Sequence, residues 1–226
     1  MNPQLMISIP ERNLTIGLDP LAASFELQAP AAYAHGRRAA AYAGILARRL
    51  GLPPAHAMAV EKAVLLHDAG TMQIPDRIMQ KTDRLSDVER HMRNNHPIAG
   101  YAMLSSMAGV QDIAEIILTH HERYDGSGYP HRLEGEDIPM GARICAVVDC
   151  LDALTSPDET VRRIFAFPEA CRYIGTRGGT RFDPQVVEAF RSIPPEEWRQ
   201  LQQTISQSAG HGQHPLPVEP VASRSF

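Results

Sequence analysis

The chain has 226 residues, of which 43% are hydrophobic, and its formal net charge at pH 7 is −4. This length fits one domain with a substantial core, and the charge gives no indication of attraction to bulk nucleic acid or to a membrane, although a local site could still bind a small phosphate ligand. No apolar run approaches the roughly 18 residues that a transmembrane helix needs, and the amino terminus lacks the pattern of a signal peptide. The three cysteines do not follow the spacing of a disulfide framework, so we expect a reducing compartment and a cytoplasmic protein.

Helical periodicity begins after an amino-terminal extension. Residues 1–29 contain three prolines and no sustained helical period, and they are too few for a separate domain. The first predicted helix begins near Ala31 and ends at Gly51, because apolar residues recur between them at helical spacing. The second predicted helix begins at Pro53–Pro54 and reaches His67.

The middle of the chain contains shorter predicted helices. The sequence SDVE at 86–89 is a capping box, which opens a third helix that Pro97 interrupts. The next predicted helix covers 97–107, with the proline in its first turn. An isoleucine-rich helix then leads into the two histidines at 120–121, and a glycine-rich loop follows over 122–139.

The last third of the chain begins with an apolar segment, RICAVVDCLDALT, at 143–155. Its β-branched residues are compatible with a strand, but its length favours a buried helix. Weaker helical patterns follow at 168–175, 184–192 and 195–207. The tail at 208–226 is rich in Pro, Gly and Ser, and we expect it to be disordered. The predicted fold class is therefore all-α, a single helical-bundle domain over 30–207.

The first candidate functional residues are His67 and Asp68 in the sequence LLHDAG. His67 shares an apolar helical face with Ala63 and Val64, so taken alone it could be a buried histidine that bonds the backbone. A carboxylate is costly to bury at the end of an apolar helix, and the C-terminal end of a helix disfavours negative charge. A bound metal ion would remove both costs, although a local turn could also satisfy Asp68.

Further histidines and acids extend this pattern. His96 directly precedes a proline, and taken alone it could simply mark a helix boundary. His120 and His121 continue two helical rows of isoleucine, which is unusual for core residues. Asp149 and Asp152 project from one face of an apolar helix, so one could be a metal ligand and the other its hydrogen-bond partner.

These residues form a candidate ligand set that is larger than one ion needs. The set is His35, His67, Asp68, His96, His120, His121 and Asp149. Imidazole and carboxylate ligands without thiolates suit iron, manganese, zinc or nickel. Their number favours two divalent metal ions about 3.5–4 Å apart, bridged by one carboxylate, and such a pair can clamp phosphate oxygens during hydrolysis.

Five motifs in order resemble those of HD-GYP domains, a branch of the HD phosphohydrolase superfamily. They are LLHDAG, NNHPIAGYAML, HHERYDGSGYP, LEGEDIPMGARI and AVVDCLDALTS. The resemblance covers roughly residues 30–192, and the match at 120–130 is its most specific part. It implies an all-helical fold with two metal ions, for which we expect iron or manganese, and hydrolysis of cyclic di-GMP to pGpG and sometimes GMP. It also implies diguanylate cyclase (GGDEF) domains as partners of the signature loop.

The resemblance also assigns roles to individual residues. All seven candidate ligands would bind metal, with Asp68 as the bridging catalytic carboxylate. Asp152, the second candidate catalytic residue, would lie behind the ligands or near the catalytic water, where it could orient the nucleophile or accept its proton. Arg143, in the ARI motif, is expected to bind substrate together with Thr71 and Tyr129. The signature loop contains Gly126, Gly128, Tyr129 and Pro130. It either fixes the helix that carries the two histidines or contacts substrate or a partner through the tyrosine ring.

Three positions depart from the family pattern. Thr71 replaces the lysine of the HDxGK motif, which removes a positive charge near the substrate phosphate. Ala31 replaces a glutamate that allows a third metal ion in some members, so two ions are expected. The Arg-Pro-Tyr that often follows DALTS is missing, and Arg162 and Arg163 lie at different positions. Two alternatives therefore stand beside the phosphodiesterase: a weak or inactive module that senses cyclic di-GMP or binds proteins, and a hydrolase of another phosphoester or nucleotide.

Overall fold

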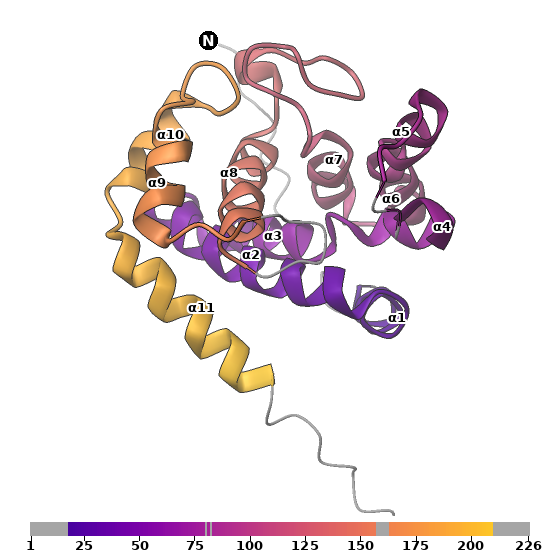
Figure 1. Ribbon diagram of the computed structural model, residues 1–226, viewed down its shortest axis with the longest axis horizontal. Helices are drawn as coiled ribbons and strands as arrows, with labels where there is room; N and C mark the ends of the chain where they lie inside the picture. The colour runs from indigo at the N-terminus through magenta and orange to yellow at the C-terminus, as the bar shows by residue number, and fades with distance from the viewer. Residues whose placement is uncertain (1–17, 80, 82, 157–162, 210–226) are drawn as a thin grey trace, which may run out of the picture.

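The computed structural model describes residues 18–79, 81, 83–156 and 163–209. In this part of the chain every regular element is a helix, and the helices form a bundle (Figure 1). The elements are α1 (Asp19–Gln28), α2 (Pro30–Arg49), α3 (Pro54–Leu66), η1 (Ala69–Gln73), α4 (Asp76–Met79), α5 (Asp87–Arg93), α6 (His96–Leu104), α7 (Gln111–Thr119), η2 (Gly135–Asp137), α8 (Met140–Thr155), α9 (Phe167–Gly175), α10 (Pro184–Arg191) and α11 (Pro195–Ala209). The predicted all-α class is confirmed.

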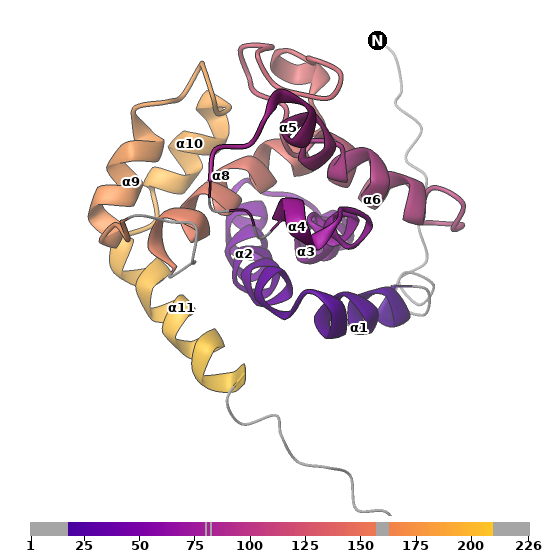
Figure 2. The same cartoon turned by 45° about the vertical axis from the view of Figure 1, so that its right-hand side comes forward.

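Helices α2, α3 and α8 form the centre of the bundle, with α9 to α11 on one side and α4 to α6 on the other (Figures 1 and 2). The backbones of α2 and α3 approach closely at Gly36, where an added Cβ atom would lie 2.5 Å from the carbonyl oxygen of Leu65. Helix α8 buries its apolar residues, and Leu151 has 0% exposure. The helix predicted at 143–155 is therefore confirmed, and the strand alternative is wrong.

Helix α1 corrects the expectation that residues 1–29 lack helical structure. Pro20 lies in the first turn of this helix, where proline is tolerated and does not prevent helix formation. Phe25 is fully buried, and its ring meets the ring of Tyr33 edge-on at 5.8 Å between centroids. One buried aromatic side chain anchors α1 on α2, and such a single anchor leaves no periodic apolar pattern in the sequence. The domain limits of 30–207 stay a prediction.

The elements between α3 and α7 place two predicted ligands, Asp68 and His96, next to each other. The capping box is confirmed, because Glu89 N donates to Ser86 Oγ at 3.3 Å and Ser86 N donates to Glu89 Oε2 at 2.8 Å. Helix α6 covers His96–Leu104, so it begins one residue before its proline and ends earlier than the predicted 107. A Cβ atom on Gly70 of η1 would collide with the carbonyl oxygen of His96. Glycine therefore lets η1 and α6 pack in direct contact.

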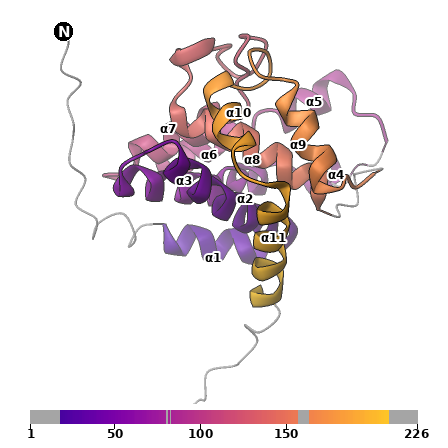
Figure 3. The same cartoon turned by 90° about the vertical axis from the view of Figure 1, so that its left-hand side faces the viewer.

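The carboxyl-terminal helices α9 and α10 agree with the predictions at 168–175 and 184–192. Helix α11 extends away from the bundle (Figure 3), and the fully buried Trp198 anchors it, with its ring 5.6 Å from the ring of Tyr42. This helix continues to Ala209, beyond the predicted end at 207, and the rest of the predicted disordered tail lies outside the described residues. None of the helices that the structure describes is long and apolar enough to cross a membrane.

Candidate metal centre

Helix ends and helix faces bring the predicted ligands together. His67 and His120 are the residues that follow α3 and α7, and each keeps a helical backbone conformation. His96 is the first residue of α6, while His35 and Asp149 lie within α2 and α8. The packing of these helices therefore decides which imidazoles and carboxylates meet.

Three of the imidazoles are oriented by the backbone in the same way. In each, ring atom Nδ1 lies within hydrogen-bond distance of the carbonyl oxygen three residues earlier: His67 and Val64 at 2.7 Å, His96 and Arg93 at 2.8 Å, His120 and Ile117 at 2.7 Å. Because a carbonyl oxygen can only accept, Nδ1 must carry the proton and donate. The lone pair of Nε2 is then free to bind a cation, which is the usual arrangement of a metal-binding histidine.

Asp68 belongs to two groups of possible ligand atoms. One group is Asp68, His96, His120 and His121, and the other is His35, His67 and Asp68. Within each group the ligand atoms lie within 4.8 Å of one another. Oδ1 of Asp68 is 3.2 Å from Nε2 of His96, and Oδ2 is 3.5 Å from Nε2 of His67. One carboxylate oxygen toward each group is the arrangement expected of a ligand that bridges two ions.

The pKa shifts of His120, His121 and Asp68 suit metal binding, whereas Asp68 raises the pKa of His96 against the effect of burial. Burial lowers the pKa of His120 well below its ordinary value and lowers the pKa of His121 to about 4. Burial opposes the charge on Asp68, but His67, His96 and His120 hold the pKa of this carboxyl well below its usual range. Metal ions bind neutral imidazole and ionised carboxylate. At neutral pH, His120, His121 and Asp68 are therefore already in the form that binds a cation.

His35 and Asp149 lie on the other side of Asp68. Oδ1 of Asp149 is 3.1 Å from Nε2 of His35 and 3.9 Å from Nε2 of His67. Burial opposes a charge on His35, but Asp149 and Asp152 raise the pKa of its imidazole well above the ordinary value. The two carboxylates thus stabilise a proton on His35, which indicates that their negative charge favours a cation at this position.

Asp152 holds His35 from behind. It is fully buried, and His35 Nδ1 lies 2.7 Å from its Oδ2. Arg38 donates from Nε to Oδ1 and from a terminal nitrogen to Oδ2, both at 2.8 Å, and the hydroxyl of Ser156 donates to Oδ1 at 3.0 Å. This bidentate contact is a strong, directional arrangement. Asp152 therefore fixes the His35 ring so that Nε2 faces Asp149.

The signature loop is shaped by contacts with its own first residues. The Glu122 side chain is buried at 3% exposure and accepts hydrogen bonds from the backbone nitrogens of His131 at 2.7 Å and Leu133 at 3.2 Å. A Cβ atom on Gly128 would lie 2.5 Å from Cα of Glu122. Gly126 has a φ of 73°, which favours glycine. These contacts hold the loop directly behind the two adjacent histidines.

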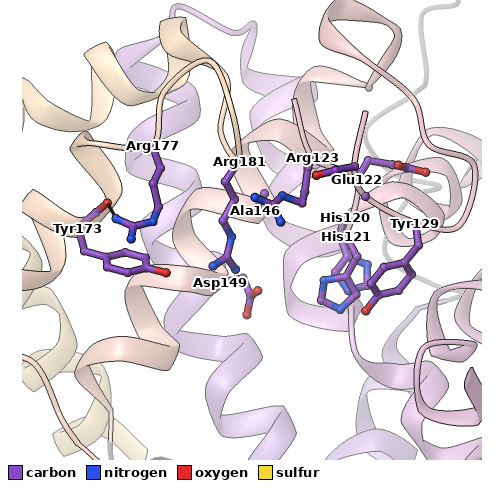
Figure 4. A pocket seen from close by; sticks show the side chains of 12 residues that line it. His120, His121, Glu122, Arg123, Tyr129, Ala146, Asp149, Tyr173, Arg177 and Arg181 are labelled. Atoms are coloured by element: carbon purple, nitrogen blue, oxygen red, sulfur yellow. Dashed lines mark hydrogen bonds between the residues drawn. The ribbon is translucent and has the colours of Figure 1, made fainter. Parts of the chain in front are cut away.

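A cavity of about 360 Å³ opens beside the cluster (Figure 4). Its wall includes His120, His121 and Tyr129, which lie together in Figure 4, and also Asp149. The tyrosine ring lies 4.9 Å from the ring of His121, between centroids. The wall also includes Tyr173 and three arginines, Arg123, Arg177 and Arg181. The cavity therefore joins the candidate ligands to a cationic surface, which suits an anionic substrate.

Of the predicted substrate-binding residues, Tyr129 lies in the cavity wall, whereas Thr71 and Arg143 do not. The hydroxyl of Thr71 donates to the carbonyl oxygen of Asp68 at 2.6 Å. Arg143 donates to Oδ2 of Asp183, the N-cap residue of α10, at 2.6 Å. Both predicted residues are therefore engaged within the protein, and a role in substrate binding stays a prediction.

Of the two arginines that follow the missing Arg-Pro-Tyr, Arg163 does not lie in the cavity wall. Arg163 pairs with Glu169 at 2.8 Å, and Arg162 lies outside the described residues. The cations of the wall come from positions that sequence reasoning missed. Arg38, which contacts Asp152 and does not line the cavity, was also missed, although its position three residues after His35 on one helical face is a signal. Arg181 offers no such local signal.

The bundle and its two His/Asp groups define a helical metal-binding domain of the HD type. The chain belongs to the HD domain family, whose model matches residues 21–186. It is 39% identical over 175 residues to the cyclic di-GMP phosphodiesterase response regulator RpfG of Xanthomonas campestris pv. campestris, covering 76% of this chain and 46% of the relative. It is 35% identical over 197 residues to a cyclic di-GMP phosphodiesterase of Thermotoga maritima, covering 83% of this chain and 52% of the relative.

A solved structure shows the same fold. The cyclic GMP-AMP-specific phosphodiesterase V-cGAP3 of Vibrio cholerae aligns with a TM-score of 0.59 at 20% identity, over 82% of this chain and 51% of that chain. The resemblance to HD-GYP domains is confirmed by the curated relatives. The chain spans about half the length of these two relatives. The family and the His/Asp cluster together indicate the use of divalent metal.

Proposed function

We propose that this chain is a metal-dependent phosphodiesterase that hydrolyses cyclic di-GMP to pGpG, GMP or both. The main observation in support is that two ligand groups share Asp68 at one end of an arginine-lined cavity. The relatives at 39% and 35% identity, both named as cyclic di-GMP phosphodiesterases, support this substrate. A GGDEF partner for the signature loop stays a prediction.

The residues present fit two divalent ions, for which iron and manganese suit the nitrogen and oxygen donors. One ion would be held by Asp68, His96, His120 and His121, and the other by His35, His67, Asp68 and Asp149. When bound, such a pair supplies a water of lowered pKa and neutralises charge on the phosphate. Asp68 would have a catalytic role because it belongs to both ligand groups and would contact both ions.

The remaining residues orient the site and the substrate. Both oxygens of Asp152 already accept hydrogen bonds from His35, Arg38 and Ser156, so we assign Asp152 to the positioning of His35 and not to proton transfer. Burial raises the pKa of the Tyr129 phenol, so the hydroxyl stays protonated and can donate to a phosphate oxygen beside His121.

A second candidate is a module that binds cyclic di-GMP without hydrolysing it efficiently. Thr71 favours this candidate, because its hydroxyl is buried and donates to the carbonyl oxygen of Asp68. Threonine carries no positive charge, and its hydroxyl proton is already donated within the protein and is not available to a phosphate. The candidate keeps the same fold and the same ligand groups, and it differs only in turnover.

Product analysis separates the two candidates. The protein is loaded with Mn²⁺ or, without oxygen, with Fe²⁺, and it is incubated with cyclic di-GMP and, in parallel, with other cyclic dinucleotides. We expect pGpG or GMP to form from cyclic di-GMP. Binding without product in the wild-type protein, with turnover only in Thr71→Lys, would contradict the enzyme and support the module.

A further inference from the structure

The arginines that line the cavity lie on two loops. They do not occupy the positions of the basic residues that the family pattern has and this sequence lacks. Arg177 and Arg181 belong to the turn between α9 and α10, which we call the arginine turn and define as residues 177–182. Arg123 lies at the start of the signature loop. Figure 4 shows the three guanidinium groups around the cavity, with Arg181 pointing into it between the other two.

The guanidinium groups of the arginine turn are not neutralised by acids. Among the residues that the structure describes, no carboxylate forms an ion pair with Arg177 or Arg181. Arg177 donates to the carbonyl oxygen of Tyr173 at 2.8 Å, and its guanidinium lies 3.4 Å from the centre of the Tyr173 ring. Arg181 lies 5.1 Å from the centre of the Phe182 ring. Two unpaired, half-buried cations in one cavity wall favour an anionic ligand.

Hydrogen bonds connect the backbone of the arginine turn to the signature loop, and α8 contacts the residue that follows the turn. The backbone nitrogen of Asp125 donates to the carbonyl oxygen of Thr180 at 2.9 Å, and Gly179 N donates to the carbonyl oxygen of Phe182 at 2.9 Å. The next residue, Asp183, accepts from Arg143 of α8 at 2.6 Å. Arg143 therefore positions the turn. The backbone of the turn is fixed in this way, so only the arginine side chains need to be ordered when a ligand binds.

The position of the arginine turn in the cavity indicates which part of a substrate it would contact. His120 and His121 form one end of the cavity, which we call the metal end, and in Figure 4 Arg177 and Tyr173 lie on the side away from it. Asp149 lies between these two sides, below the guanidinium of Arg181 (Figure 4). A cyclic dinucleotide carries two phosphodiesters, and only one of them can lie at the metal end. The second phosphodiester needs a cation elsewhere in the same cavity.

We propose that Arg177 and Arg181 bind the phosphodiester of a cyclic dinucleotide that is not being cleaved. This inference rests on the proposed function, because it takes the substrate class from it. It also explains how a chain with Thr71 in place of the family's lysine holds a dianionic substrate. The guanidinium groups act by charge-assisted hydrogen bonds and form no covalent intermediate.

The test compares a substrate that has two phosphodiesters with one that has a single phosphodiester. Arg181→Gln and Arg177→Gln are measured against Arg172→Gln, which removes an exposed arginine of α9 outside this cavity. Binding of cyclic di-GMP to the metal-loaded proteins is measured by equilibrium dialysis, and the recovered ligand is quantified as intact or hydrolysed. Hydrolysis of bis(p-nitrophenyl) phosphate reports the metal centre alone. Metal content and thermal midpoint confirm that each variant is folded.

We expect each cavity variant to bind cyclic di-GMP about tenfold more weakly, the magnitude for one charged hydrogen bond. Turnover of the small diester should fall by a smaller factor than the affinity for cyclic di-GMP does. Arg181→Lys should bind with intermediate affinity, because it keeps the charge but loses the guanidinium fork. Unchanged cyclic di-GMP binding in both glutamine variants would overturn the inference even if hydrolysis occurs. Intact ligand that binds the wild type more tightly than the variants would support the inference while contradicting the proposed hydrolysis. Absence of binding to the wild type would overturn both.

Discussion

Replacing Asp152 by asparagine tests whether this residue positions His35. Asparagine has nearly the shape of aspartate, but it is neutral and one of its two terminal atoms becomes an NH2 donor. Oδ1 of Asp152 accepts from Arg38 and Ser156, and Oδ2 accepts from Arg38 and His35. Whichever way the amide is turned, two donor contacts therefore lose their acceptor.

The expected magnitude follows from burial. Breaking a buried ion pair by removing one partner typically costs about 3–5 kcal/mol. The Arg38 side chain keeps 19% exposure while Asp152 keeps 1%, so water partly compensates the arginine. We therefore expect the free energy of unfolding to fall by about 3 kcal/mol. Because His35 is no longer fixed, metal affinity should fall about 10- to 100-fold.

Two measurements on the same variant separate positioning from general stability. Urea unfolding of the metal-free protein gives the stability, and titration with Mn²⁺ gives the affinity. Ser156→Ala is the matched control, because it removes one neutral donor to the same carboxylate and should cost about 1 kcal/mol with little change in affinity. If Asp152→Asn loses stability but binds Mn²⁺ as tightly as the wild type, Asp152 does not position His35.

Three further predictions concern the ligand bridge, the signature loop and the substrate charge. Asp68→Asn should lose at least one bound metal ion per chain, as counted by elemental analysis, whereas Asp112→Asn, at an exposed acid of α7, should keep the wild-type number. Gly128→Ala should lower the free energy of unfolding in urea by about 1–3 kcal/mol, because its Cβ atom would meet the backbone of the loop. An equal loss in Gly175→Ala, where the added Cβ atom has only ordinary contacts, would contradict that reason. Thr71→Lys should lower KM for cyclic di-GMP and leave hydrolysis of bis(p-nitrophenyl) phosphate less affected; an unchanged KM would show that this position does not reach the substrate.

Much of the fold could be predicted because its signals are local. The capping box at Ser86, the proline near the start of α6 and the apolar rows of α7 and α8 each mark a helix or its boundary. Helix α1 escaped prediction because Phe25 is its single fully buried residue among the described ones. The contact of Phe25 with Tyr33 depends on where α2 lies relative to α1. The sequence of α1 alone contains no information about that position.

In the candidate site too, local patterns indicate some residues, while long-range packing brings in the others. The histidines stand at the ends of helices or on buried faces, so their spacing alone could indicate a shared centre. The partners of Arg143 and the position of Arg181 could not be predicted in this way. Arg143 pairs with an acid forty residues later, and Arg181 reaches the cavity through a turn that other segments hold in place. Long-range packing determines these contacts, and a single sequence records no pattern for them.

The most direct test of the central claim counts metal ions and measures turnover in one preparation. The protein is loaded with Fe²⁺ or Mn²⁺, freed of excess ion, analysed for metal per chain and incubated at once with cyclic di-GMP. Two ligand groups sharing Asp68 predict two ions per chain and release of pGpG or GMP, both lost on chelation. Hydrolysis that persists after the metal is removed, or a fully loaded protein with two ions and no product, would contradict a binuclear phosphodiesterase.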